Sequence, residues 1–190
     1  MELSYTTHIY GCSSSSITLI YPKQKALSQF KKMYKLISRA LGIALIILVE
    51  GTVFNIFLWQ GREEILTIGT IAAPIAILAR LATKKERTGF DFFKYLVFAI
   101  MPFFIAEASS PIWGGKGIVV SVGLLTFLVS GLLPTPNNPT IKIFGLIAKW
   151  AFFIALLLKV LHLPYSNVIL LLTSLIFCLW IFYRFVIRAD

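Results

Sequence analysis

Long apolar segments alternate with short polar ones along the chain, and this alternation predicts the architecture. Each apolar segment is close to the roughly 20 residues that a helix needs to cross the hydrocarbon of a bilayer. An unsatisfied backbone polar group in hydrocarbon costs several kcal/mol, so each segment is expected to be a helix. The predicted spans cover residues 41–59, 65–81, 90–108, 117–133, 141–161 and 167–187. The pattern therefore predicts an all-α membrane protein with six transmembrane helices.

The polar tips that join these spans in pairs repeat one another. The first tip lies within Gly51–Gly69, and the stretch Trp113–Gly123 repeats its Trp, Gly, base, aliphatic and Gly positions. Further on, Leu158–Leu170 repeats the apolar spacing of Phe54–Leu66. A pattern that recurs in this way indicates one structural unit written several times. We expect three consecutive hairpin repeats, at about 41–81, 90–133 and 141–187.

Composition supports a membrane protein and argues against nucleic-acid binding. The chain is 58% hydrophobic and 14% charged, with a mean hydropathy of +0.85, which is outside the range of soluble domains. The net charge of +10 arises from bases at the ends of the apolar segments rather than along one exposed face. Bases in such places orient helices and contact lipid headgroups. The expected partner of these bases is therefore the bilayer, and no nucleic acid.

The N-terminal region divides into two parts by pattern. Residues 1–25 show no sustained period and are expected to form a mobile cytoplasmic tail. Residues 26–39 place apolar side chains at helical spacing, with bases between them. This pattern predicts a basic amphipathic juxtamembrane helix lying on anionic headgroups, with protein binding as the alternative. Residues 40–190 are expected to form the transmembrane domain.

The distribution of bases predicts orientation. All Lys and Arg residues except Arg62, Lys116 and Lys159 lie in the N-terminal region, in residues 80–94, in residues 134–149 or at the C-terminus. Cytoplasmic loops are the ones enriched in Lys and Arg. Both termini are therefore expected in the cytoplasm, and all three tips outside.

A few polar residues inside the spans are candidates for function. Glu50 lies nine residues before Trp59, about 14 Å along a helix, which is near mid-membrane. A charge at that depth costs about 2.5–3.5 kcal/mol on insertion scales. The residue is thus either a proton- or cation-binding carboxylate or a neutral acid bonded to a neighbouring helix. Lys149 and Lys159 either extend to the inner and outer interfaces or pair with Glu50, and Asn55 is expected to bridge helices.

Four further candidates lie near the external tips. His162, Glu107, Glu63 and Glu64 carry groups that bind zinc or similar cations. Their sequence spacing matches no local ligand motif, and a histidine beside Pro164 is more typical of a helix end. The sequence therefore predicts no metal site.

No enzymatic motif is present in the sequence. It has no phosphate-binding Gly-rich loop, no His-Glu-x-x-His and no Gly-x-Ser-x-Gly. Cys178 lies inside an apolar segment and is expected to be a small buried side chain. We expect a non-enzymatic protein without a cofactor.

Two stretches resemble the N-terminal transmembrane hairpin of the gliding motility protein GldL family of the Bacteroidota. They are Gly51-x-x-Phe-x-Ile-x-x-Trp-x-Gly-x-x-x-Leu-x-Ile-Gly69 and Leu158-Lys-Val-Leu-His-Leu-Pro164. The resemblance implies an inner-membrane protein, and the family member itself is the ring-forming half of a proton-driven motor that pairs with a single-span partner. Lys159 and His162 match the polar positions of the family, and Asn55 replaces its first lysine.

The departures from the family pattern concern the motor function. The family carries an intramembrane glutamate in its second helix, and the corresponding places near Ala73 and Phe177 are apolar here. The chain is also expected to lack the long cytoplasmic domain of the family. These differences argue against a motor role.

Two functions remain open from the sequence. One is a subunit or assembly partner of an inner-membrane complex, or a homo-oligomer, in which Gly42, Gly51, Gly69, Gly123 and Gly131 let helices approach closely. The other is a proton- or cation-conducting protein that uses Glu50. Three hairpins that all enter from one side do not form the inverted repeats of many transporters, which favours the first.

Overall fold

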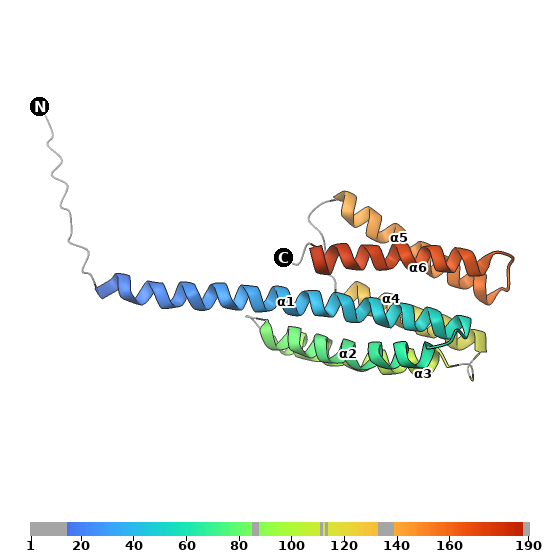
Figure 1. Ribbon diagram of the computed structural model, residues 1–190, viewed down its shortest axis with the longest axis horizontal. Helices are drawn as coiled ribbons and strands as arrows, with labels where there is room; N and C mark the ends of the chain where they lie inside the picture. Colours follow the sequence, from blue (N-terminus) through green and yellow to red (C-terminus); the bar gives the residue numbers. More distant parts are fainter. Residues whose placement is uncertain (1–14, 85–87, 111, 113, 133–138, 188–190) are drawn as a thin grey trace, which may run out of the picture.

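The structure is a computed structural model that describes residues 15–84, 88–110, 112, 114–132 and 139–187, with side chains assigned from residue 28 onward except at residue 115. All regular structure within these residues is helical (Figure 1). The elements are α1 (Ser15–Phe57), α2 (Arg62–Thr83), α3 (Gly89–Ala108), α4 (Gly114–Leu132), α5 (Pro139–Val160), α6 (Ser166–Phe182) and the π-helical turn η2 (Tyr183–Ile187). The predicted all-α class is confirmed.

Five of these helices are long and apolar enough to cross a membrane. They are Ser28–Phe57 within α1, α2, α3, α5 and the combined α6–η2 segment Ser166–Ile187. The apolar part of α4, Lys116–Leu132, is shorter, about 25 Å at about 1.5 Å per residue. The chain is therefore a multi-pass helical membrane protein, and the sixth crossing stays a prediction.

Helix α1 is the centre of the bundle. It contacts α2, α3, α4 and α6, whereas each of the other helices packs mainly on its neighbours in sequence. Its membrane segment is 61% buried, against 22% for α3 and 28% for α5. The outer faces of α3, α5 and α6 carry rows of exposed apolar side chains, as expected for surfaces in contact with lipid.

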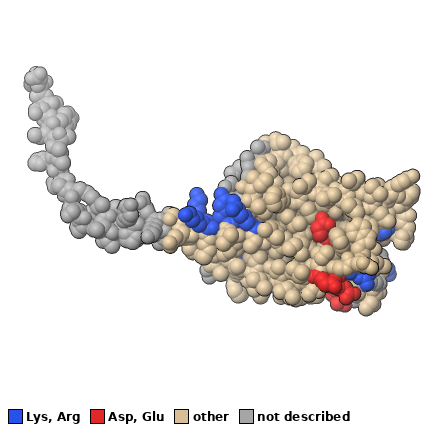
Figure 2. All heavy atoms as spheres, viewed as in Figure 1, with Lys and Arg blue, Asp and Glu red and all other residues tan. Residues whose placement is uncertain are grey.

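The helices run back and forth along one long axis. Figure 1 shows α1, α3 and α5 finishing at one end of the bundle, which we call the tip end, and α2, α4 and α6 finishing at the other. We call the end at which α2, α4 and α6 finish the basic end. Lysines and arginines gather there around α1, where this helix extends out of the bundle (Figure 2). These include Lys31, Lys32, Lys35 and Arg39 of α1, all exposed.

The N-terminal half of α1 differs from the prediction. Residues 15–25 are helical rather than a tail, and residues 26–39 continue into the first span without a turn. The reason is local, because Ser38-Arg-Ala-Leu41 holds neither Gly nor Pro, and extending an existing helix is far easier than starting a new one. The part of the predicted tail before residue 15 lies outside the described residues.

Two glycines allow α1 and α2 to touch backbone to backbone. A Cβ atom on Gly51 would lie 2.8 Å from the Cα of Leu66, and one on Gly69 would lie 2.7 Å from the Cα of Leu48. Gly42 similarly makes room for the side chain of Phe185 at its Cβ, and Gly131 for the ring of Phe98. The prediction that small residues permit close helix approach therefore fits these four positions.

Gly123 is the exception to this pattern. A Cβ atom there would meet nothing within 4 Å. Gly123 therefore does not bring two helices of this chain together, and its expected role in close helix approach stays a prediction.

The first and third turns at the tip end have the same backbone. Leu58 and Gly61 adopt φ of 55° and 77°, and His162 and Tyr165, each 104 positions later, adopt 53° and 63°. Four backbone hydrogen bonds recur with the same shift, among them Trp59 N to Phe54 O and Leu163 N to Leu158 O, both 3.1 Å. The α1–α2 and α5–α6 hairpins therefore share a turn in register, while the repeat across all three hairpins stays a prediction.

Candidate functional site

Glu50 lies on α1, half-buried, and contacts α6. The thiol of Cys178 donates a hydrogen bond to Glu50 Oε1 at 3.2 Å. Cys178 itself is buried and free of any disulfide. The structure thus gives Glu50 a neutral partner, and neither of the two lysines considered from the sequence pairs with it.

Lys159 lies at the tip end, where three helices meet. Its ammonium donates to Asn167 Oδ1 of α6 and lies 5.2 Å from the ring centroid of Phe57 in α1. Together these contacts join α5 to α6 and to α1 near the turns of the tip end.

Asn55 links the first hairpin to the second. Its buried side-chain amide donates to Ser109 O at 2.8 Å and to Ser109 Oγ at 3.0 Å, at the C-terminus of α3. Amides commonly bridge membrane helices in this way, so the residue has a structural explanation.

The four tip candidates do not form a shared site. Glu63 pairs with the adjacent Arg62 at 3.8 Å, and Glu64, Glu107 and His162 are exposed. Across the part of the chain that the structure describes, no group of three or more His, Cys, Asp or Glu side chains is placed to hold a metal ion.

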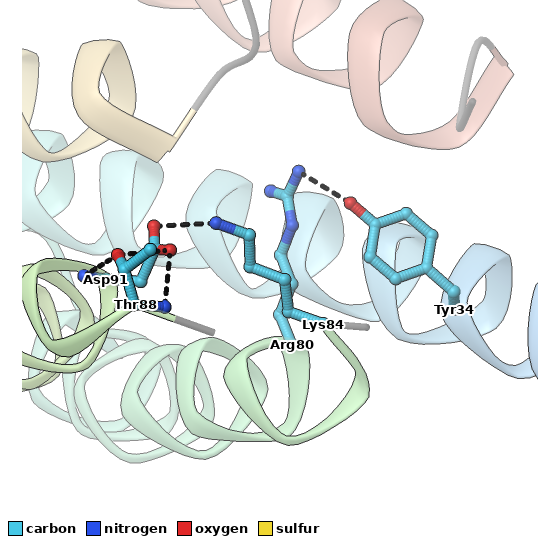
Figure 3. Close-up of polar contacts among 5 residues, drawn as sticks. All are labelled: Tyr34, Arg80, Lys84, Thr88 and Asp91. Carbon is cyan, nitrogen blue, oxygen red and sulfur yellow. Dashed lines mark hydrogen bonds and ion pairs between the residues drawn. The ribbon is translucent and has the colours of Figure 1, made fainter. Parts of the chain in front are cut away.

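Arg80 is a buried cation that the sequence pattern assigns to a basic, loop-proximal region. It is 5% exposed, inside α2, and donates to Leu132 O at 3.1 Å and to Tyr34 Oη at 3.4 Å; Figure 3 shows the contact with Tyr34. Its guanidinium also lies 5.5 Å from the ring centroid of Phe185. A cation at the carbonyl end of α4 interacts favourably with the helix dipole.

A sequence signal for this burial exists. Arg80 lies seven positions after Ala73 and three after Ile77, a spacing that places all three on one face of the helix. Ala73 and Ile77 are both fully buried, so this face points into the bundle. Arg80 therefore joins α1, α2, α4 and η2 at the basic end, which is a structural role.

An ion pair, also drawn in Figure 3, joins the end of α2 to the start of α3. Lys84 Nζ lies 2.6 Å from Asp91 Oδ1, and Asp91 forms a capping box with Thr88 at the start of α3. The hydrogen bond to Asp91 raises the pKa of Lys84 above its ordinary value. Lys84 therefore stays charged at physiological pH.

A groove of about 410 Å³ separates α4 from α5, and we call it the α4–α5 groove. Its walls include Gly123, Thr126 and Ser130 of α4 and Leu146, Lys149 and Trp150 of α5. Leu146 and Trp150 are exposed on the outer face of the bundle, so the groove opens toward lipid.

Lys149 is the charged group of this groove. It is half-buried, and its ammonium lies 5.2 Å from the ring centroid of Trp180. Within the described residues no carboxylate forms an ion pair with it. The hydroxyl of Thr126, on the opposite wall, is buried and has no hydrogen-bond partner there either.

The fold and these contacts define a multi-pass helical membrane protein whose lipid-facing surface contains a basic groove. Comparisons with protein-family models, with curated proteins and with solved structures find no match. The resemblance to the GldL hairpin therefore stays an expectation from the sequence.

Proposed function

We propose that this protein is a non-enzymatic subunit or assembly partner of an inner-membrane complex. The observation that supports this most is Lys149 in the α4–α5 groove, a cation within a membrane helix that lacks an ion-pair partner among the described residues. Inserting a charged lysine near the centre of a membrane helix costs about 2.5–3.5 kcal/mol. The contact with Trp180 offsets about 0.5–2 kcal/mol of this. A neighbouring membrane protein at the groove supplies the remaining stabilisation.

The proposed arrangement in the membrane has six spans in three hairpins, with the tip end outside and both termini in the cytoplasm. The bases around α1 at the basic end and the shared turn of the first and third hairpins support it. Single cysteines in a cysteine-free background test it with a membrane-impermeant maleimide. A cysteine at exposed His162 should react from outside and one at exposed Gly89 should not; the reverse result contradicts the orientation.

The resemblance to the GldL hairpin is part of this proposal. It implies a bacterial inner membrane for the complex, with Lys159 and His162 at the polar positions of the family hairpin. The contacts of Lys159 with α1 and α6 give it an anchoring role inside one chain.

Affinity capture tests the subunit role. The tagged protein, extracted in a mild detergent from its native membrane, should bring down specific membrane proteins in fixed proportion. A variant with Lys35→Met, an exposed change at the basic end, serves as the control and should retain them. Recovery of the chain by itself, under conditions that preserve other complexes of the same membrane, would count against the proposal.

A second function, proton conduction through Glu50, has one observation in its favour. The carboxyl group of this intramembrane residue contacts the thiol of Cys178, and no lysine or arginine of the described residues forms an ion pair with it. Purified protein in liposomes with an internal pH dye measures this directly. Conduction requires that Glu50→Gln abolish a flux that the unaltered protein shows.

A further inference from the structure

We propose that the α4–α5 groove is the docking site for a transmembrane helix of another protein, and that this helix carries an Asp or Glu facing Lys149. The inference rests on the proposed subunit function and adds the chemistry of the neighbour. It is carried by the groove, by the charge of Lys149, which has no ion-pair partner among the described residues, and by the small residues on the opposite wall.

The depth of the groove requires an occupant that lies in the membrane. Lys149 is near the middle of the α5 span Pro139–Val160, about 15 Å from its first residue at about 1.5 Å per residue. Half of a hydrocarbon core is about the same distance. A lipid headgroup stays at the membrane interface, about half a hydrocarbon core away from the groove walls near Lys149. A helix that crosses the bilayer reaches the groove at this depth.

The α4 wall is shaped for close approach of a helix. Gly123, Thr126 and Ser130 follow one another at three and four positions, which places their small side chains on one helical face. Gly123 has open space in front of it, unlike the glycines that pack within the chain. Small residues on one face are what membrane helices use to bring their backbones together.

Charge decides what the docking helix carries. Lysine has three donors and no acceptor, and a buried charge is stabilised by an opposite charge with hydrogen bonds. A carboxylate in the groove accepts hydrogen bonds from the ammonium of Lys149 and neutralises its charge.

Among the described residues, a second copy of this chain has no acid placed to reach Lys149. Glu50, the acidic residue deepest within the described spans, contacts Cys178 at the packed surface between α1 and α6. Presenting it to the groove of another copy would require opening the contact of α6 with the central helix. Asp91 and Glu107 lie near the ends of α3, away from the depth of Lys149.

Photo-crosslinking in the native membrane tests the proposal. A photoreactive phenylalanine analogue replaces Phe127 or Trp150 at the groove, and Leu172, exposed on α6, provides the control position. Each is made in the unaltered chain and with Lys149→Met or Lys149→Arg. We expect groove crosslinks to a transmembrane segment with an Asp or Glu at the matching depth. Their yield should fall about 5- to 30-fold with Lys149→Met and persist with Lys149→Arg.

The other outcomes separate this inference from the subunit function. Crosslinks from the groove to lipid or to a second copy, while other proteins still copurify with the chain, overturn the docking site and leave the subunit function standing. A groove crosslink to a helix without an Asp or Glu has the same consequence. So does a groove crosslink whose yield is unchanged by Lys149→Met. If the chain is captured alone and crosslinks to no protein from the groove or from the control position, both the docking site and the subunit function are overturned.

Discussion

The contact between Gly69 and α1 makes a quantitative prediction about stability. In Gly69→Ala the new Cβ atom would lie 2.7 Å from Leu48 Cα, where ordinary contacts are 3.4 Å or more. The obstacle is backbone, so no side chain can rotate away, and α1 and α2 must separate by about 0.7 Å at their crossing. Overpacking of this kind costs about 1–3 kcal/mol. Alanine returns about 1 kcal/mol of helix propensity. We expect a net loss of up to about 2 kcal/mol.

Thermal unfolding in detergent measures this with a thiol-reactive fluorophore. In a Cys12→Ser background Cys178 is the remaining thiol, and because it is buried it reacts as the bundle opens. At about 2–4 °C per kcal/mol the midpoint of Gly69→Ala should fall by up to about 8 °C. Gly123→Ala is the matched control, since its Cβ atom meets nothing. It should leave the midpoint unchanged or raise it. If Gly69→Ala raised the midpoint as much as Gly123→Ala does, the backbone contact would not exist.

Two further predictions concern the basic end. Arg80→Met should destabilise the bundle by about 1–3 kcal/mol, because Leu132 O loses its charged donor, whereas exposed Lys35→Met should change the same unfolding midpoint little. The Lys84–Asp91 pair should stabilise the folded protein in a pH-dependent way, because the pKa of Lys84 is raised in the folded state. The stabilisation is complete below the ordinary pKa of 10.5 and is lost as pH rises through the pKa of the folded state. The difference in midpoint between the unaltered chain and Lys84→Gln should therefore be constant from pH 7 to 9 and should shrink above about pH 10.5; a difference that shrinks below pH 9 would contradict the pairing.

The Glu50–Cys178 contact shows why intramembrane charge alone does not establish transport. A carboxyl group with a thiol donor in a packed helix contact has a structural use, because it joins the central helix to α6. Lys149 differs because its groove is open to lipid and its nearest described partner is an aromatic ring. This charge has no ion-pair partner among the described residues, and for this reason we propose the groove as the contact with another membrane protein.

The sequence by itself determined the helical class, the membrane setting and the approximate bounds of the helices. These follow from one-dimensional properties: segment length, hydropathy and the turn residues between segments. Hydropathy also located the turn between Phe57 and Arg62 and the turn before Ser166. It did not detect that α1 continues through residues 26–39, because an amphipathic helix on a surface and the exposed part of a longer helix have the same pattern.

Tertiary structure alone decided which polar groups meet. Arg80 lies within hydrogen-bonding distance of Leu132 and Tyr34, residues roughly fifty positions away in opposite directions, and no local pattern encodes such pairs. The thiol that Glu50 contacts is 128 positions away. The α4–α5 groove likewise exists because two helices from different hairpins leave space between Gly123 and Trp150. Side-chain chemistry is written along the chain, but a site arises where packing brings distant segments together.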